Sequence, residues 1–289
     1  MAGLALGAGS TQDDNPAAMT ANDTATRDAD GTPTPAAAPA GARHALVVGA
    51  SSGLGAALVR QLAREGRRVA AVARRGDVLA DLVRDASAEA AAAGGAVFAH
   101  THDVRDTDAV PALFEAIVRE LGGLELLVYA AGTRPAVGRT EYDTEKDLDV
   151  LAVNFGGLVA WGNQAAQLFR TQRAGTLVGI SSIAGNRGRK GHPLYGASKA
   201  AMDNWLESLR NRLAGEGVHV CTIKPGYIAT RLTAGLDGLF WVATPSQAAA
   251  AVLEAARARA NVRYVLRRWG VVGRLLPLIP SFVFRRLEF

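Results

Sequence analysis

The chain has 289 residues, 49% of them hydrophobic, and can therefore bury a full core, most simply one α/β domain with appended segments. Its single cysteine, Cys221, excludes an intramolecular disulfide, and no spacing of cysteine and histidine indicates a metal site. The net charge of +5 is uneven, because residues 1–42 hold five Asp and one Arg whereas residues 257–289 hold eight Arg and one Glu. A basic end is compatible with nucleic acid or an anionic membrane surface, and charge alone selects neither.

The first 42 residues mix Ala, Thr, Pro, Gly and Asp without apolar periodicity. Such a segment cannot bury enough apolar surface to offset its ordering entropy, so we expect residues 1–42 to form a disordered tail. No Lys or Arg precedes Arg27 and no sustained apolar run is present, which argues against a secretory signal. The expected location is cytoplasmic.

A glycine-rich turn follows the first apolar run. Residues 45–48 are typical of a short strand, the next seven spell GASSGLG, and the apolar pattern through Leu62 predicts a helix. Gly49 permits the tight turn, Gly53 lets the backbone approach a pyrophosphate, and Gly55 lets the helix pack close to the strand. A plain strand-to-helix turn is the alternative. We favour dinucleotide binding, with phosphates at the free N–H groups of the helix N-terminus, through Gly49, Ser51, Ser52, Gly53, Leu54 and Gly55.

The end of the second predicted strand, residues 69–73, indicates which dinucleotide. NAD-binding folds place Asp or Glu there for the ribose 2′-hydroxyl, and this chain has Arg74 and Arg75 instead. Planar guanidinium groups suit a 2′-phosphate. Two solvated arginines at the start of a helix are the alternative. The phosphate interpretation predicts NADP(H) in preference to NAD(H).

Two later strands end in residues that suit the adenosine half of a dinucleotide. The strand at residues 96–102 runs into Asp103 and Val104, where the carboxylate can accept from the adenine amino group or cap the next helix. The following strand leads to Ala131 and Gly132, whose small size would leave room for the adenine-side ribose. We therefore expect Asp103 and Val104, and also Ala131 and Gly132, to contact the cofactor.

Residues 181–199 carry the chemistry around which the chain is organised. Tyr195 and Lys199 lie four apart on one predicted helix face, and an ammonium beside a phenol favours the phenolate. Ser182 follows a buried strand, at the carboxyl end where ligands of open α/β sheets bind. Asn154, on an otherwise apolar helix face, is either a satisfied core amide or a group that holds water near the active centre.

The remaining elements complete an α/β fold. They are a strand at 218–223 broken by Pro225 and Gly226, a poorly periodic lid at 231–243, a helix at 246–259 and a strand at 263–266. Five or more alternating strand and helix units predict a doubly wound parallel sheet with helices on both faces. We expect a nucleotide-binding domain at residues 43–267, followed by an apolar and Arg-rich extension at residues 268–289.

These elements in this order resemble the classical short-chain dehydrogenase/reductase family, which has a Rossmann fold, over about residues 44–266. The matching motifs are GASSGLG at Gly49, AAG at Ala130, Asn154, Ser182, YxxxK at Tyr195 and PGYIAT at Pro225. The resemblance implies a catalytic tetrad of Asn154, Ser182, Tyr195 and Lys199, and cofactor contacts from Tyr195, Lys199, Pro225, Gly226 and Thr230. Two departures, Val48 for Thr and Tyr129-Ala130 for two Asn, concern support of the sheet rather than chemistry.

The resemblance implies NADPH-dependent reduction of a carbonyl, or the reverse reaction. Hydride would pass from the nicotinamide to a carbonyl carbon, Tyr195 would supply the proton, and Ser182 would donate a hydrogen bond to the oxygen. Lys199 would lower the pKa of Tyr195 and bind the nicotinamide ribose, Asn154 would anchor a water that relays protons, and Thr230 would hold the carboxamide. The implied partners are a small-molecule substrate and further copies of the chain, in a homodimer or homotetramer paired through helices near Asn163 and after Tyr195.

The extension at residues 268–289 is too short and too interrupted to span a membrane, because its apolar part at 271–284 contains Arg274 and two prolines. One interpretation is a strand-covering extension or dimer contact. The other is an interfacial anchor, with Arg at lipid headgroups and Trp269 in the acyl boundary. Similar endings occur in family reductases of lipid-linked sugars or long-chain ketones, so such a substrate at a membrane surface is an alternative class.

Two other functions compete with the enzyme hypothesis. The chain could be a catalytically idle nucleotide-binding regulatory or scaffold protein, although the intact tetrad argues against this. Binding of nucleic acid by the Arg-rich end is not expected, since aromatic interleaving and recognition motifs are missing. The sequence does not identify the substrate. Its pocket would be built from the loops at residues 185–194 and 231–243, and such loops vary freely on a fixed scaffold.

Overall fold

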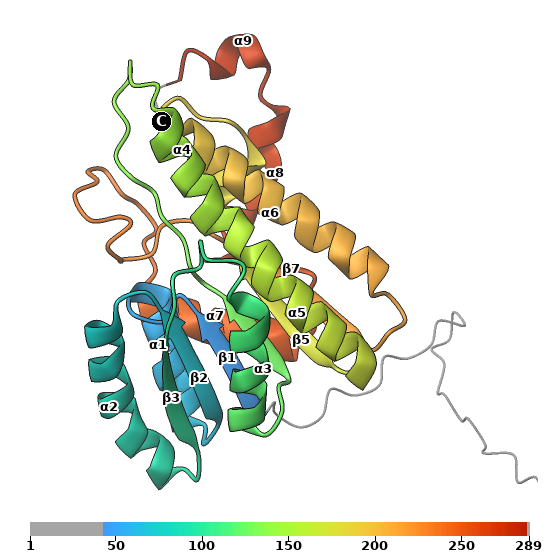
Figure 1. Cartoon of the computed structure of the whole chain (residues 1–289). Helices are drawn as coiled ribbons and strands as arrows, with labels where there is room; N and C mark the ends of the chain where they lie inside the picture. Colours follow the sequence, from blue (N-terminus) through green and yellow to red (C-terminus); the bar gives the residue numbers. More distant parts are fainter. Residues whose placement is uncertain (1–42, 288–289) are drawn as a thin grey trace, which may run out of the picture. The chain divides into compact units, whose positions relative to one another are not determined.

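The computed structural model describes residues 43–287, so the expected disordered segment, residues 1–42, lies outside the described part. Seven parallel strands form one sheet in the order β3-β2-β1-β4-β5-β6-β7 (Figure 1). The strands are β1 (His44–Val48), β2 (Arg68–Ala73), β3 (Ala96–Thr101), β4 (Leu126–Tyr129), β5 (Gly175–Ile180), β6 (Val218–Pro225) and β7 (Val262–Val265). The order reverses between β1 and β4, and ligands of such sheets bind at the carboxyl ends beside that reversal.

Helices cover both faces of the sheet, which confirms the predicted doubly wound fold (Figure 1). One face packs against α1 (Gly53–Arg64), α2 (Gly76–Ala92) and α7 (Pro245–Arg257). The other packs against α3 (Val110–Leu121), α5 (Gly157–Gln172) and α6 (Pro193–Arg212). Shorter pieces are α4 (Thr144–Leu151), a π-helical turn (Ala152–Gly156), a 3-10 turn (Ile183–Asn186), α8 (Trp269–Leu275), a second 3-10 turn (Leu276–Leu278) and α9 (Ser281–Phe284).

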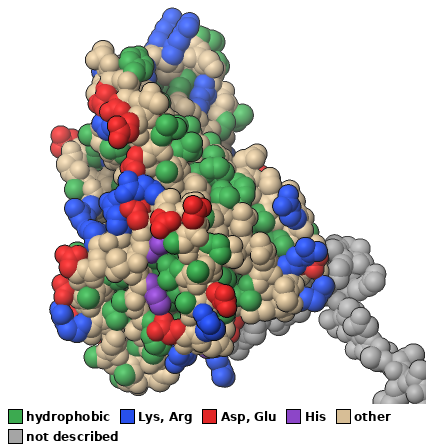
Figure 2. Space-filling view, viewed as in Figure 1, with side chains coloured by type: hydrophobic (Ala, Val, Ile, Leu, Met, Phe, Trp, Pro, Cys, Tyr) green, Lys and Arg blue, Asp and Glu red, His purple; other side chains and the backbone are tan. Residues whose placement is uncertain are grey.

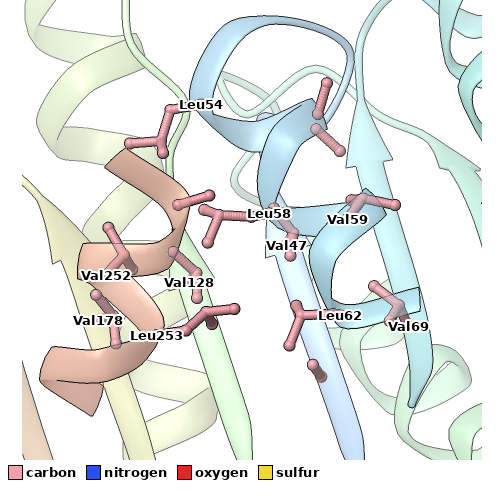
Figure 3. Close-up of a cluster of buried hydrophobic side chains, with 14 of the residues drawn as sticks. Val47, Leu54, Leu58, Val59, Leu62, Val69, Val128, Val178, Val252 and Leu253 are labelled. Atoms are coloured by element: carbon pink, nitrogen blue, oxygen red, sulfur yellow. The ribbon is translucent and has the colours of Figure 1, made fainter. Parts of the chain in front are cut away.

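The central strands are buried on both faces, which is why they read as continuous apolar runs. Along β1 the side chains alternate, with Val47 in the cluster on the α1 face and Leu46 in the cluster on the opposite face. On the α1 face, Val47 packs with Leu58 of α1 and Val252 of α7 (Figure 3). This packing fixes the start of α1 against the end of β1, where the glycine-rich turn lies.

Element boundaries differ from the sequence-based expectations at a few ends. The strand predicted at 218–223 continues as β6 to Pro225, which pairs with Val265 of β7. A proline is tolerated there because it lacks only an N–H group and has an extended backbone at the strand's last position. Among residues 43–287, no helix has the length and apolar character needed to cross a bilayer.

Candidate active site

A cavity of about 950 Å³ lies at the carboxyl ends of the strands. The loops after β1, β2, β3, β4, β5 and β6 all contribute to its lining, together with part of the predicted lid. Of the predicted site residues, all except Asn154 line it: Gly49, Ser51, Ser52, Gly53, Leu54, Gly55, Arg74, Arg75, Asp103, Val104, Ala131, Gly132, Ser182, Tyr195, Lys199, Pro225, Gly226 and Thr230. The topology therefore brings residues from six loops to one crevice.

The glycine-rich turn has the close contacts that only glycine permits. Gly49 has a φ of +91°, and a Cβ there would lie 2.3 Å from the backbone nitrogen of Ala131. A Cβ on Gly55 would lie 2.1 Å from the carbonyl oxygen of Gly49. Ser52 is the N-cap of α1, and its side chain accepts no hydrogen bond from the first turn. The first N–H groups of α1 are thus left for an anionic ligand, as a dinucleotide pyrophosphate requires.

The two arginines after β2 have different partners. Arg75 donates from Nη2 to the hydroxyls of Ser51 and Ser52, at 2.9 Å each, so its guanidinium group lies over the glycine-rich turn. Arg74 is mostly exposed and lies 3.5 Å from Asp103. Both line the cavity. The pair therefore forms a cationic rim where the adenosine ribose of a dinucleotide would lie in this fold.

Asp103 is held by cations on two sides. Arg105 donates to both carboxylate oxygens, and with a backbone hydrogen bond from Arg105 and the charge of Arg74 it lowers the pKa of Asp103 to about 2, against the opposing effect of burial. The second alternative for Asp103, capping of the next helix, is not observed, since α3 begins at Val110 with Ala109 as its N-cap. The carboxylate is therefore charged at every physiological pH.

Tyr195 and Ser182 form the reactive pair of hydroxyls. Burial raises the pKa of Tyr195, while a hydrogen bond with the Ser182 side chain and the charges of Arg134 and Arg189 oppose that rise. The Ser182 oxygen also accepts from the backbone N–H of Ala184 at 3.1 Å, which fixes it at the start of the 3-10 turn. A ligand carbonyl placed between these hydroxyls would meet two donors.

Lys199 is buried on the same helix as Tyr195, one turn further along. Its ammonium nitrogen lies 5.8 Å from the centroid of the Tyr195 ring and donates to the carbonyl oxygen of Ile180 at 2.9 Å. Burial lowers the pKa of Lys199 to about 8, although Asp203 acts in the opposite direction. That Lys199 lowers the pKa of Tyr195 stays a prediction, and burial of the phenol acts in the opposite direction.

Asn154 lies behind the cavity, fully buried in the π-helical turn. Its side-chain oxygen accepts from the backbone N–H of Thr133 at 2.7 Å, and its nitrogen donates to the Thr133 carbonyl and to the Ser198 hydroxyl. These hydrogen bonds are those of a satisfied core amide, and the role of Asn154 in holding a water stays a prediction. The Asn154 side chain ties the loop after β4 to the helix that carries Tyr195.

The tyrosine that departs from the family pattern has a supporting role in the structure. Tyr129 is fully buried at the end of β4 and donates from its hydroxyl to the carbonyl oxygen of Val153 at 2.6 Å. A Cβ on Gly157 would lie 2.2 Å from the same hydroxyl, so the glycine makes room for it. This contact fastens the sheet to the π-helical turn that holds Asn154.

Several residues that line the cavity were not singled out from the sequence, although Arg189 lies in the loop at 185–194 that was expected to form the pocket. Arg134 and Arg189 approach Tyr195 from the loops after β4 and β5, and Tyr227 and Trp269 have ring centroids 5.5 Å apart. A basic residue in an irregular loop has no motif that marks it. Trp269 belongs to the C-terminal extension and is buried, so it forms part of the cavity wall and does not lie where the interfacial-anchor interpretation expected it, in the acyl boundary.

Side chains from the loop after Ser182 hold the extension in place. Asn186 donates to the carbonyl oxygen of Gly273 at 2.7 Å and to the Tyr264 hydroxyl at 3.1 Å. Arg187 donates to the carbonyl oxygens of Leu276 and Ile279 and lies over the ring of Phe284. The extension therefore packs against the loop that borders the reactive hydroxyls.

Comparison with known proteins agrees with this geometry. A family model described as short chain dehydrogenase matches residues 43–237. An uncharacterized oxidoreductase of Mycobacterium tuberculosis is 33% identical over 86% of this chain and 98% of its own length. The cis-4-hydroxycyclohexanecarboxylate dehydrogenase of Sinomonas cyclohexanicum is 35% identical over 67% of this chain and 76% of its own.

A solved structure shows the same architecture. The actinorhodin polyketide ketoreductase with NADPH superposes with a TM-score of 0.69 at 26% identity, covering 79% of this chain and 97% of that one. The residues matched by the family model, 43–237, include the glycine-rich turn, Ser182, Tyr195 and Lys199. The chain belongs to the short chain dehydrogenase family and is an NAD(P)-dependent oxidoreductase that acts on alcohol or carbonyl groups.

Proposed function

We propose that the chain is an NADPH-dependent reductase of a ketone, with Tyr195 as general acid. The observation that carries this proposal is the hydrogen-bonded pair of Tyr195 and Ser182 hydroxyls on the cavity that begins at the glycine-rich turn. Because burial raises the pKa of Tyr195, its phenol is protonated at neutral pH, the form that donates a proton during reduction. A relative's name includes a secondary alcohol on a carbon ring, which supports this substrate class.

The other tetrad residues have distinct proposed roles. When bound, the nicotinamide supplies the hydride. Ser182 donates to the carbonyl oxygen as negative charge develops on it. Lys199 binds the nicotinamide ribose, and its proximity to Tyr195 then contributes a positive charge to the phenol. Asn154 positions the loop after β4 and, through Ser198, the helix turn that carries Tyr195.

The proposed cofactor is NADP(H) rather than NAD(H). The supporting observation is the cationic rim of Arg74 and Arg75, with no carboxylate at the end of β2 to accept from a ribose 2′-hydroxyl. Asp103 and Val104 would meet the adenine, and Ala131 and Gly132 the ribose beside it. Pro225, Gly226 and Thr230 would border the nicotinamide.

The experiment that tests the proposal is NADPH consumption over steroid, sugar, acyl and aromatic ketones. We expect turnover with at least one class, and loss of turnover in Tyr195→Phe. Binding of NADPH without turnover of any ketone would contradict the reductase and support the idle nucleotide-binding alternative. A control without ketone separates substrate reduction from slow oxidation of NADPH.

A second proposal concerns the extension, whose exposed surface combines apolar and basic side chains. The large hydrophobic side chains there that are at least 37% exposed are Val271, Leu275, Leu278, Phe282 and Val283, and the exposed basic ones are Arg268, Arg274, Arg285 and Arg286. Where Figure 1 draws α9, Figure 2 shows basic side chains beside hydrophobic ones. We propose a peripheral contact with an anionic membrane, compatible with a lipid-linked or long-chain ketone. Vesicles of anionic lipid are expected to co-float with the full chain, and equal flotation without residues 268–289 would contradict this.

The number of copies in the assembly is also a proposal. We infer a homodimer or homotetramer that pairs through α5 and α6, as the resemblance implies. Light scattering of the purified chain tests this at several concentrations. A monomer at micromolar concentration would contradict it.

A further inference from the structure

An acidic side chain continues the row that Tyr195 and Lys199 begin on α6. Tyr195, Lys199 and Asp203 follow one another at intervals of four residues, so they share one face of the helix. The proposed chemistry gives roles to Tyr195 and Lys199 but none to Asp203. The Asp203 side chain is only 19% exposed, and a carboxylate is costly to bury unless a charge or a hydrogen bond partners it.

A lysine from the neighbouring strand holds Asp203. The ammonium nitrogen of Lys224 lies 2.8 Å from the Oδ2 atom of Asp203, and the Lys224 side chain is 13% exposed. Lys224 lies in β6 directly before Pro225, and both Pro225 and Gly226 line the cavity. The ion pair therefore joins the middle of α6 to the carboxyl end of β6, beside the cavity.

The loop that follows Ser182 packs over the same place. A Cβ on Gly185 would lie 2.8 Å from the Oδ2 atom of Asp203 and 2.8 Å from the backbone carbonyl carbon of Lys199. The backbone of this loop therefore approaches α6 closely between those two residues. The hydroxyl of Ser181 also donates to the carbonyl oxygen of Lys199, at 3.2 Å. Loop, helix and strand thus enclose the Asp203 carboxylate next to Lys199.

The second oxygen of this carboxylate is not used by the ion pair. The Oδ1 atom of Asp203 is buried and has no hydrogen-bond partner among residues 43–287. Burial lowers the pKa of Lys199 to about 8, and the negative charge of Asp203 acts in the opposite direction. Without that carboxylate, the Lys199 ammonium would lose its proton at a lower pH.

The other groups around Lys199 do not supply a negative charge in place of Asp203. The ammonium nitrogen faces the ring of Tyr195 and the carbonyl oxygen of Ile180 at the end of β5. The π-helical and 3-10 turns that pack against α6 contain no titratable side chain, and the carboxylates of α4 do not act on Lys199. The charge that β6 contributes is Lys224, a second cation. Within the described part of the chain, Asp203 is therefore the carboxylate that favours the charged lysine.

We propose that Asp203 is a positioning residue of the reductase, which keeps Lys199 in its charged form, and that Lys224 holds the carboxylate in place for this role. Asp203 is not among the residues that line the cavity, so it acts through Lys199 rather than on cofactor or substrate. This inference rests on the proposed function, in which a charged Lys199 binds the nicotinamide ribose and adds a positive charge beside the Tyr195 phenol.

The direct test follows the proton on Lys199 in the full chain. Lysine labelled with ¹³C at Cε gives four NMR signals, because the chain has four lysines, Lys146, Lys190, Lys199 and Lys224. The signal that Lys199→Met removes identifies Lys199, and its titration gives the pKa. We expect that pKa to be about one pH unit lower in Asp203→Asn than in wild type. Glu207→Gln makes the same change in charge at an exposed position one turn later on α6, and is the control that leaves the pKa unchanged.

The direction of the change separates loss of charge from loss of packing. If Asp203→Asn only loosened the contact between α6 and the loop, water would reach Lys199 and its pKa would rise towards the ordinary 10.5. An unchanged or higher pKa of Lys199 in Asp203→Asn therefore contradicts the inference. Asp203→Glu keeps the charge, so we expect it to keep the pKa of Lys199 closer to wild type than Asp203→Asn does. Thermal midpoints compare the folding of the variants, and Asp203→Ser is a second neutral replacement for which the same fall is expected.

The pH profile of the reaction is the second readout, with NADPH and a ketone that the substrate screen identifies. Reduction requires the charged lysine in the proposed function, so kcat/KM falls as the pH rises through the pKa of Lys199. In Asp203→Asn we expect this fall about one pH unit lower, which reduces kcat/KM about tenfold on the alkaline side and keeps the plateau at lower pH. A profile that stays as in wild type, although the NMR titration shifts, contradicts the role of Asp203 in the reaction.

The two readouts separate this inference from the proposed function. A lower pKa of Lys199 in Asp203→Asn, in a chain that turns over no ketone, supports the link between the two residues and contradicts the reductase. Turnover of a ketone, together with a pKa of Lys199 that Asp203→Asn leaves unchanged, contradicts the inference alone. Neither turnover nor a change in the pKa contradicts both.

Discussion

The ammonium nitrogen of Lys199 donates a 2.9 Å hydrogen bond to the carbonyl oxygen of Ile180, the last residue of β5. This contact ties helix α6 to the strand that leads to Ser182. It also holds a charge in a place that is only 4% exposed. Burial lowers the pKa of Lys199 to about 8, because the buried ammonium is less stable than one in water. The charged Lys199 therefore lowers the free energy of unfolding at neutral pH.

The first prediction follows from that lowered pKa. The unfolded chain holds the Lys199 proton up to about pH 10.5 and the folded chain up to about pH 8, so unfolding takes up a proton between these values. The free energy of unfolding of wild type therefore rises with pH in this window relative to Lys199→Met, on the order of 2–3 kcal/mol in total. Urea unfolding of both chains at pH 7 and pH 10 measures this, since other groups titrate alike and cancel. An equal difference at both pH values would contradict the buried charge.

The second prediction concerns the general acid. Tyr195→Phe removes the hydroxyl but keeps the ring, so we expect kcat to fall by about 10²- to 10⁴-fold while the Kd of NADPH stays near that of wild type. Tyr142→Phe, at a side chain that is 94% exposed, is the matched control and keeps both values. Steady-state kinetics and NADPH fluorescence titration provide the two numbers. Turnover retained in Tyr195→Phe would remove this residue from the chemistry.

Local patterns were enough to predict the fold and the crevice. Continuous apolar runs at β1 and β5 indicated strands that are buried on both faces. The apolar residues between the predicted strands recur at helical spacing, which indicated helices that connect parallel strands. The glycine at position 49 indicated the tight turn, because only glycine fits such a turn. The structure agrees, since Gly49 has a φ of +91° and a Cβ there would collide with Ala131. The placement of Tyr195 on the cavity was predicted from the end of the strand that leads to Ser182 and from the start of the helix that carries Tyr195. Each of these inferences uses residues close together in sequence or a general rule of sheet topology.

The unpredicted contacts join residues far apart in the chain. Arg134 and Leu232 are 98 positions apart, and Arg187 and Ile279 are 92 apart. A single arginine in a loop has no periodicity, and its partner is a backbone carbonyl, which every residue carries. The effect of burial on the pKa of Tyr195 was not predicted for a related reason, since desolvation depends on packing that spacing does not reveal.

The third prediction concerns cofactor selection. Arg75→Gln removes a guanidinium charge beside the proposed 2′-phosphate, so we expect the KM for NADPH to rise about 10- to 100-fold with little change for NADH. Arg84→Gln, on the exposed side of α2, is the matched control. Steady-state kinetics with both cofactors measure the effect. Equal increases for NADPH and NADH would instead indicate that Arg75 serves only to hold Ser51 and Ser52 in the turn.

The last prediction concerns the contacts that Arg187 makes with the C-terminal extension. Arg187 donates to the carbonyl oxygens of Leu276, at 2.9 Å, and Ile279, and its guanidinium carbon lies 4.0 Å from the centroid of the Phe284 ring. Its replacement removes this donor from the Ile279 carbonyl and leaves the Leu276 carbonyl with only the backbone N–H of Ile279, at 3.4 Å, and it also removes a cation–π contact. Arg187→Ala is therefore expected to lower the free energy of unfolding by about 1–3 kcal/mol.

The same change has an expected local signature. Since Trp269 of the extension lines the cavity, loosening of residues 276–287 in Arg187→Ala is expected to raise the KM for substrate more than it lowers kcat. Limited proteolysis is expected to cut this segment earlier than in wild type, whereas Arg212→Ala leaves both readouts unchanged. Unchanged cleavage together with unchanged KM would mean that packing of Trp269 against Tyr227 holds the extension without Arg187.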